Sequence, residues 1–255
     1  MTAALAGRVV VITRPAHQAH HFQALVKQVG AEVALCPTID IQPLADNQAA
    51  RLRLTELPYY QSVIFISANA VQFAHDLCNE TQRQHLQQLC LGAIGKKTAE
   101  ALVACGYQVT LVAQSGFTSE DFLQLAALQQ LEQQRILIVR GQGGRELLAR
   151  SLSERGASVD YLDVYQRVKP TPLNWQQLRY LKTHAQRLII SFTSAESVHN
   201  FLALTNNGLD LSKLTLLVGG QRIAQTARMV GFSGTLIVAD DPSDESMFKA
   251  LLSAQ

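Results

Sequence analysis

The feature that most constrains the fold of this chain is an internal repeat. The segment VVVITRP, which begins at Val9, resembles ILIVRG from Ile136, and Gly30-Ala31 recurs 126 residues later as Gly156-Ala157. Two further pairs follow in the same order: FISANAV and FTSAESV begin at Phe65 and Phe192, and LCLGAIGKKTAEAL and LTLLVGGQRIAQTA begin at Leu89 and Leu214. Units that recur in one order at nearly one offset predict two similar domains.

Each repeat combines short apolar strands with helices. Residues 136–139 form an apolar, β-branched run typical of a strand buried on both faces, and a glycine turn and a helix over 146–155 follow it. Gly156 fits the position just past that helix. Similar patterns predict strands at 9–13, 33–36, 62–67, 89–94, 109–112, 159–165, 187–192, 214–218 and 236–238. They predict helices at 15–29, 47–57, 70–78, 95–106, 119–131 (capped by Ser119), 178–182, 194–204, 220–230 and from 243 onward, with 37–43 as a connector.

The alternation of strands and helices predicts the α/β class. We expect two similar parallel-sheet α/β domains, each sheet covered by helices on both faces. A cleft between two such domains is the default place for a ligand.

Composition excludes several classes of protein. The net charge is only +2 and the chain has no Lys/Arg cluster longer than two, so we expect no nucleic-acid partner. No apolar run approaches the roughly 20 residues that span a bilayer, and the N-terminus does not read as a signal peptide. Four cysteines without CxxC spacing predict buried free thiols in a reducing cytosol, and hence a cytoplasmic protein: Cys36, Cys78, Cys90 and Cys105.

The glycine turn GQGGRE at 141–146 raises the alternative of a dinucleotide-binding loop. It follows a strand and opens a helix, but Glu146 stands where the third glycine belongs. A carboxylate in the first helical turn would repel a pyrophosphate at that helix end. Asp160 and Asp163 lie about 20 residues on, which alone is weak support, so a nicotinamide enzyme ranks last among our hypotheses.

Metal and covalent chemistry also lack support. His17, His20 and His21 have helical spacing, but no carboxylate or cysteine completes a ligand set nearby, so we predict no metal site. Ser67 and Ser194 lack the GxSxG elbow of a nucleophilic serine and fit better as helix caps.

The loops that follow the predicted strands carry hydroxyl, amide and basic groups. They contain Arg14, Ser67, Ala68, Asn69, Gly95, Lys96, Thr98, Arg140, Gly141, Thr193, Ser194, Gly220, Gln221 and Arg222. Ligands of open α/β sheets bind at the carboxyl ends of strands, where helix amides favour anions. The set therefore suits a ligand with several carboxylates. The alternative that each hydroxyl is a cap and each basic residue a solvated charge stays open.

Five segments together resemble the uroporphyrinogen-III synthase family over essentially the whole chain. In order they are ITRP, FISANAV, GAIGKKTAEAL, ILIVRGQGGRELL and LDVYQRVKP. The resemblance implies a first domain built from both chain ends, residues 1–37 plus 172–255, and an inserted domain at 43–164. The linker strands would be 38–42 and 165–171, bounded by prolines at 37, 43, 170 and 172.

The activity that the resemblance implies is a cofactor-free lyase reaction. Hydroxymethylbilane, a linear tetrapyrrole with eight carboxylates, would lose water and close to uroporphyrinogen III with ring D inverted, in haem biosynthesis. The terminal hydroxyl would leave as the pyrrole nitrogen pushes, and a spiro intermediate would turn ring D over. The enzyme would fold the substrate and prevent unflipped closure. We expect a monomer to which the preceding pathway enzyme could hand over the substrate.

Tyr165 matches the tyrosine that this family places in its cleft. A phenol is protonated at neutral pH, because its ordinary pKa is about 10, so it could donate a hydrogen bond to the departing hydroxyl. Thr98, Ser67 and Ser194 match polar positions of the family more loosely. The loop at 220–223 has no hydroxyl where the family carries threonine, which leaves its backbone amides as the available groups.

A binding protein is the alternative from another class. Two α/β domains could close on a small anion without turnover, although the missing signal peptide and the free cysteines count against it.

Overall fold

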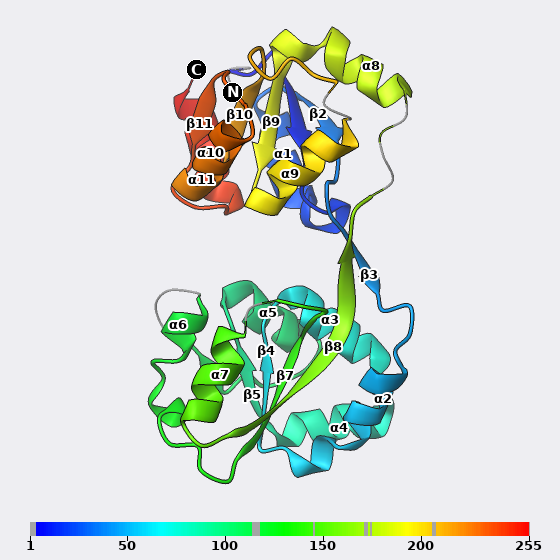
Figure 1. Ribbon diagram of the computed structural model, residues 1–255, viewed down its shortest axis with the longest axis vertical. Helices are drawn as coiled ribbons and strands as arrows, with labels where there is room; N and C mark the ends of the chain where they lie inside the picture. Colours follow the sequence, from blue (N-terminus) through cyan, green and yellow to red (C-terminus); the bar gives the residue numbers. More distant parts are fainter. Residues whose placement is uncertain are drawn as a thin grey trace. The chain divides into compact units, whose positions relative to one another are not determined.

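The computed structural model describes residues 4–113, 118–144, 146–170, 173, 175–205 and 208–254. The chain divides into two compact units. Unit 1 comprises Met1–Asp40 with Val168–Gln255, and unit 2 comprises Ile41–Arg167. Figure 1 shows one sheet in each unit, with helices on both of its faces.

Unit 1 is built on a sheet of five strands in the order β11-β10-β9-β1-β2, and all four pairings are parallel. The strands are β1 (Val9–Ile12), β2 (Glu32–Leu35), β9 (Leu188–Phe192), β10 (Thr215–Val218) and β11 (Leu236–Val238). The helices are α1 (His20–Gln28), α8 (Trp175–Thr183), α9 (Ala195–Leu204), α10 (Gln221–Met229) and α11 (Asp244–Ser253), with short 3-10 turns at Ala16–Gln18 and Ala185–Arg187.

Alternate residues of β1 belong to the two hydrophobic clusters of this unit. Val9 and Val11 pack with apolar residues of α9 and α10, whereas Val10 and Ile12 pack with residues of α1 and α11. All four are fully buried. This two-sided burial explains why the strand is a continuous apolar run instead of an alternating one.

Unit 2 is built on a sheet of six strands in the order β3-β8-β7-β4-β5-β6. The strands are β3 (Asp40–Pro43), β4 (Ser62–Phe65), β5 (Cys90–Ala93), β6 (Leu111–Val112), β7 (Arg135–Gly141) and β8 (Ser158–Val168). The helices are α2 (Gln48–Thr55), α3 (Ala68–Leu77), α4 (Glu80–Gln88), α5 (Lys96–Ala104), α6 (Ser119–Phe122) and α7 (Leu147–Glu154), with 3-10 turns at Leu57–Tyr59 and Ala126–Leu128. From β8 to β6 every pairing is parallel.

The sequence repeat is also a repeat in space. Strands β2-β1-β9-β10-β11 of unit 1 correspond in order to β8-β7-β4-β5-β6 of unit 2. The strand register also agrees between the units. Val10 pairs with Ile189 in unit 1, and their respective repeat partners, Ile136 and Ser62, pair with each other in unit 2. The predicted α/β class with two similar parallel-sheet domains is therefore confirmed.

Three local predictions were wrong or incomplete. Residues 37–43, which their pattern predicted as a connector and the family resemblance as part of a linker strand at 38–42, contain strand β3 (Asp40–Pro43). Helix α4 was not predicted, because Leu86 is its only buried residue and the segment has no apolar period; a capping box between Asn79 and Gln82 fixes its start. Thr118, not Ser119, caps the following helix, and its capping box with Asp121 starts a helix that ends at Phe122 instead of 131.

A buried ion pair fixes the C-terminal helix of unit 1. Arg14, at the end of β1, pairs with Asp244 in the first turn of α11, and both residues are buried. The second guanidinium nitrogen donates to the carbonyl of Pro242 at 3.4 Å. Removing one partner of such a pair leaves an uncompensated buried charge.

Asp244→Ala should therefore destabilise the protein by roughly 3–5 kcal/mol, seen as a lower urea midpoint at unchanged slope. Glu245→Ala is the control, because its bond to His21 is exposed and such pairs contribute about 1 kcal/mol at most. Equal effects of the two substitutions would contradict a structural role for the buried pair.

Candidate functional site

Unit 2 contains a pocket of about 280 Å³ at the carboxyl ends of its central strands. It opens where β7 ends in Gly141 and where β4 and β5 are followed by Ile66 and Ile94. Strand order reverses between β4 and β7, and such a switch point is the usual ligand site of an open α/β sheet.

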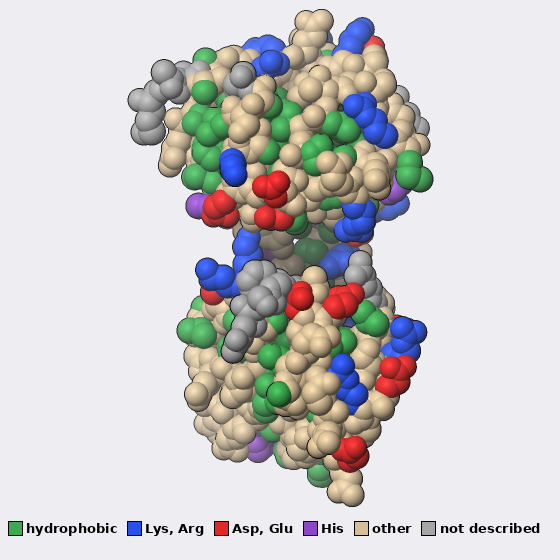
Figure 2. Space-filling model, turned by 90° about the vertical axis from the view of Figure 1, so that its left-hand side faces the viewer, with side chains coloured by type: hydrophobic (Ala, Val, Ile, Leu, Met, Phe, Trp, Pro, Cys, Tyr) green, Lys and Arg blue, Asp and Glu red, His purple; other side chains and the backbone are tan. Residues whose placement is uncertain are grey.

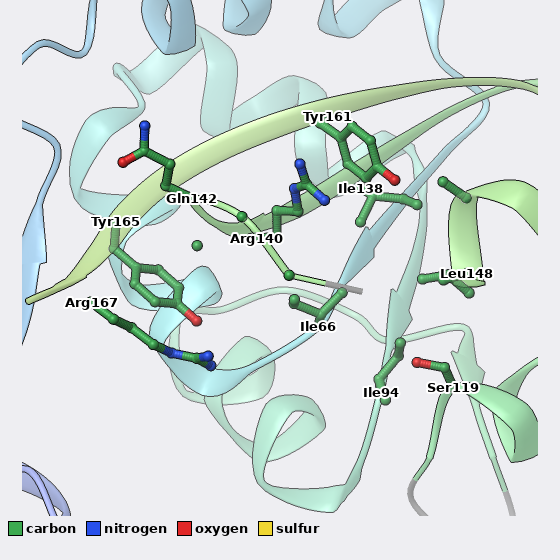
Figure 3. Close-up of a pocket in the computed structure, with 14 residues that line it drawn as sticks. Ile66, Ile94, Ser119, Ile138, Arg140, Gln142, Leu148, Tyr161, Tyr165 and Arg167 are labelled. Carbon is green, nitrogen blue, oxygen red and sulfur yellow. The ribbon is translucent and has the colours of Figure 1, made fainter. Parts of the chain in front are cut away.

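The pocket combines an apolar lining with cationic and phenolic groups. Isoleucine and leucine side chains come from three strand ends and α7, namely Ile66, Ile94, Ile138 and Leu148. Arg140 from β7 and Tyr161, Tyr165 and Arg167 from β8 add the polar groups, and the glycine turn adds backbone (Figure 3). An apolar wall with a few placed polar groups is typical of a small-molecule site.

Tyr165 is held tightly at one side of the pocket. Its register partner is Gly141, at an irregularity in the β7–β8 pairing, and a Cβ on Gly141 would lie under 3.0 Å from three carbons of the tyrosine ring. The centroid of the Tyr165 ring lies 5.6 Å from that of the Phe73 ring. The backbone carbonyl of Tyr165 accepts a hydrogen bond from the Gln142 amide at 2.7 Å. Only 1% of the residue is exposed, so the phenol is a fixed group.

The hydroxyl of Tyr165 has one hydrogen-bond partner among the described residues. Ser67 Oγ lies 3.3 Å from Tyr165 Oη. Ser67 is also the N-cap of α3 and accepts from the Ala70 amide at 3.1 Å. Ala68 and Asn69 begin that helix and are half-buried. The structure thus brings the predicted Ser67 loop and Tyr165 together.

Arg140 is anchored by its neighbours on β8. Its Nε donates to Asp163 Oδ1 at 2.9 Å, and its guanidinium carbon lies 3.4 Å from the centroid of the Tyr161 ring. These contacts fix the side chain at the pocket, while the remaining guanidinium nitrogens can still donate to a ligand.

Arg167 is a pocket residue that sequence reasoning missed. It is exposed, and in the described part of the chain its guanidinium makes neither an ion pair nor a hydrogen bond. In Figure 3 it extends alongside the phenol of Tyr165. The only sequence signal is its place two residues after Tyr165, in the stretch that the family resemblance assigns to a linker strand.

The remaining predicted residues of unit 2 lie at the start of α5. Gly95 is its N-cap with a φ of 92°, a backbone conformation that favours glycine. Thr98 is buried and its hydroxyl donates to the Ile94 carbonyl at 2.9 Å, whereas Lys96 is exposed and lies 3.8 Å from Glu100. For Thr98 the structure therefore shows a hydroxyl bonded within its own helix turn.

The other predicted residues belong to unit 1, at the carboxyl ends of β1, β9 and β10. Arg14 is paired with Asp244 as described above. Ser194 caps α9, and the half-buried Thr193 precedes it. At α10, Gly220 is the N-cap with a φ of 124°, and Gln221 and Arg222 are exposed. The structure divides the predicted set into one group in each unit.

No other titratable group of the described residues forms a comparable site. Burial raises the pKa of Cys36 and of Cys78 to about 11, so both thiols are protonated and unreactive at neutral pH. All four cysteines are free, but Cys90 and Cys105 are half-exposed, so the prediction of four buried thiols was only half right. No group of three potential metal ligands lies together in the described ranges.

A second tyrosine, with a raised pKa, belongs to a network at the opposite end of the same sheet. Tyr60 precedes β4, and burial and its hydrogen bond to Asp160 raise its pKa to about 12. Burial alone would raise the pKa of Asp160, but hydrogen bonds from Tyr60 and Arg135 lower it. This network joins the amino ends of strands, away from the pocket, and is structural.

Comparison with known proteins identifies the family. The family model described as uroporphyrinogen-III synthase HemD matches residues 20–249. The chain belongs to the uroporphyrinogen-III synthase family. It is 31% identical over 194 residues to the uroporphyrinogen-III synthase of Proteus mirabilis, covering 73% of this chain and 98% of that protein. It is 28% identical to that of Escherichia coli (strain K12) over 95% of this chain and 99% of the relative.

Solved structures with the same fold come from the same family. The synthetase of Helicobacter pylori superimposes with a TM-score of 0.68 at 20% identity, covering 97% of this chain and all of the other. A mutant synthase of Thermus thermophilus superimposes with a TM-score of 0.61 at 19% identity over 97% of both chains. The predicted family is confirmed, and the chain is an enzyme, a lyase of tetrapyrrole biosynthesis.

The packing of Tyr165 on Gly141 is open to a direct test. Gly141→Ala should place a methyl group against the ring and destabilise the protein by about 1–3 kcal/mol, measured as a lower denaturant midpoint. In a Tyr165→Ala background the same substitution should cost much less, because the clashing ring is gone. An equal cost in both backgrounds would mean that the ring does not limit the Gly141 position.

Proposed function

We propose that this chain closes hydroxymethylbilane to uroporphyrinogen III with loss of water and inversion of ring D, and that the pocket of unit 2 binds the reacting end of the substrate. The observation that carries the proposal is a fixed phenol at the switch point of a sheet in a chain of this family. The pocket volume of about 280 Å³ lies near the lower end for ligand pockets. The rest of a four-ring substrate therefore extends beyond it.

Tyr165 is the proposed general acid. Loss of the terminal hydroxyl as hydroxide is slow in water, and a phenol that donates its hydrogen to the departing oxygen lowers that barrier. Tyr165 suits this role because its ring cannot turn away between Gly141 and Phe73. A fixed donor needs no reorganisation at the moment of reaction.

Arginines and helix amides are the proposed carboxylate ligands. Arg167 supplies a cation without a protein partner in the described residues, and Arg140 supplies a second one held by Asp163. The N-termini of α3 and α5, at Ser67–Asn69 and Gly95–Thr98, favour anions through their free amides. In unit 1 we propose the same role for the loops at Arg14, Thr193-Ser194 and Gly220–Arg222.

The division of the chain into domains and linker strands is also our proposal. The chain passes between the units at Asp40–Ile41 and at Arg167–Val168, which supports linker strands at 38–42 and 165–171.

The described residues contain no helix with the length and apolarity for a membrane span. On the face in Figure 2 acidic and basic side chains are scattered among each other. We propose a cytoplasmic monomer that works without a cofactor and can receive its substrate from the preceding enzyme; the ligand cleft between the domains stays a prediction.

The activity is tested by supplying hydroxymethylbilane and separating the oxidised products by chromatography. The type III isomer should dominate, because the unassisted reaction gives type I. Tyr165→Phe should lower kcat on the order of a hundredfold while the thermal midpoint stays near that of the unchanged protein. Type I product alone from the unchanged protein would refute the function, and full turnover by Tyr165→Phe would remove only its catalytic role.

Arg167→Gln should raise KM about tenfold with little change in kcat, because a charge-assisted hydrogen bond to a substrate carboxylate is lost. Arg51→Gln removes the same charge from an exposed position on α2, where Arg51 bonds to Asn47, and should leave KM unchanged. If both variants raise KM equally, the effect is one of net charge and Arg167 is not a ligand.

A further inference from the structure

The hydrogen bond between Ser67 and Tyr165 can run in either direction, and the other contact of Ser67 bears on which oxygen donates. Ser67 Oγ already accepts from the Ala70 amide at 3.1 Å, as the N-cap of α3. That bond uses one of the two lone pairs of Oγ and leaves its hydrogen available, and Tyr165 Oη lies 3.3 Å away, with either oxygen able to donate. With Ser67 as the donor, the phenol hydrogen is free to point into the pocket.

The equivalent serine of unit 1 shows that the cap itself does not need this contact. Ser194 is the repeat partner of Ser67 and caps α9 in the same way, accepting from the Ser197 amide at 3.1 Å. Its Oγ also lies 2.8 Å from the Ser197 hydroxyl. The residue at that position in unit 2 is Ala70, which has no hydroxyl, so the hydrogen of Ser67 is left for the tyrosine.

We propose that Ser67 is a positioning residue for Tyr165, which donates its hydrogen to the phenol oxygen and thereby aims the phenol hydrogen at the leaving group. This inference rests on the proposed function. The N-terminus of α3 lies behind Ser67, and its dipole favours negative charge at that end. A serine bonded in this way supports the charge that develops on the phenol oxygen.

The step that this arrangement serves is balanced in atoms and charge. The carbon–oxygen bond of the terminal hydroxymethyl group breaks, and its electron pair leaves with the oxygen. The phenol hydrogen passes to that oxygen, so that water departs, while the pyrrole nitrogen pushes electrons into a new exocyclic double bond. The phenolate of Tyr165 accepts the hydrogen bond from Ser67. The Tyr165 phenolate regains a proton after ring closure, from the pyrrole carbon that formed the new bond. The net loss from the substrate is therefore one water.

A double-mutant cycle between Ser67→Ala and Tyr165→Phe tests the proposal. Ser67→Ala should lower kcat about tenfold, the value of one lost hydrogen bond, with KM within about twofold. In the Tyr165→Phe background it should have no further effect on kcat, because the oxygen that it positions is absent. An equal fall of kcat in both backgrounds would overturn the proposal and leave Ser67 with the cap alone.

Two further variants separate the hydrogen-bond donor from the cap. Ser67→Thr keeps both functions and should restore most of kcat. Ser67→Asp keeps an oxygen that caps α3 but has no hydrogen at neutral pH, so its kcat should be as low as that of Ser67→Ala in a folded protein. Ser67→Asp with the kcat of the unchanged protein would contradict the donor role.

The control for a lost cap is Asn79→Ala, in the same unit. Asn79 caps α4 by accepting from the Gln82 amide at 2.9 Å and is not part of the pocket. It should lower the thermal midpoint about as much as Ser67→Ala and leave kcat unchanged. If kcat falls equally in both, loss of a cap explains the effect and the proposal is wrong. Type I product from the unchanged protein would instead remove the proposed function on which this inference rests.

Discussion

A parallel sheet must bury both of its faces, and this requirement determines where polar chemistry can occur in each unit of the chain. Val9 to Ile12 of β1 are all fully buried, and so are Ile136 and Leu137 of β7. Strands of this kind have no side chain to spare for a ligand. Arg140, Ser67 and Arg14 accordingly follow strands or end them, and the pocket of unit 2 lies at the carboxyl ends of the strands of that unit.

The two units use the same framework differently. Arg14 and Arg140 are repeat partners at the ends of β1 and β7, and each is paired with an aspartate. In unit 1 the C-terminal helix supplies Asp244 and buries the pair, whereas in unit 2 the partner Asp163 comes from the neighbouring strand and the arginine lines a pocket. The same position of the repeat thus carries a buried ion pair in unit 1 and lines a pocket in unit 2.

The sequence predicted the framework better than the site. Apolar runs indicate which strands and helix faces are buried, because burial depends on residue type, and the repeat at one offset indicates two similar domains. The strands, most helices and the fold class could therefore be predicted. Helix α4 could not, because one buried leucine leaves no periodic signal. The irregular β7–β8 pairing that brings Tyr165 onto Gly141 depends on the backbone register, and Arg167 reaches the pocket only because of where β8 ends. Neither the contact of Tyr165 with Gly141 nor the place of Arg167 at the pocket produces a pattern in the sequence, so neither could be predicted.

The proposed function depends most on binding of the reacting end of the substrate in the pocket of unit 2. The most direct measurement is a crystal structure of the protein with uroporphyrinogen III bound. We expect a pyrrole ring against Ile66 and Ile138 and a carboxylate within hydrogen-bond distance of Arg167. The Tyr165 hydroxyl should face the pyrrole ring while Ser67 stays bonded to that hydroxyl. A product molecule bound with this pocket empty would contradict the claim.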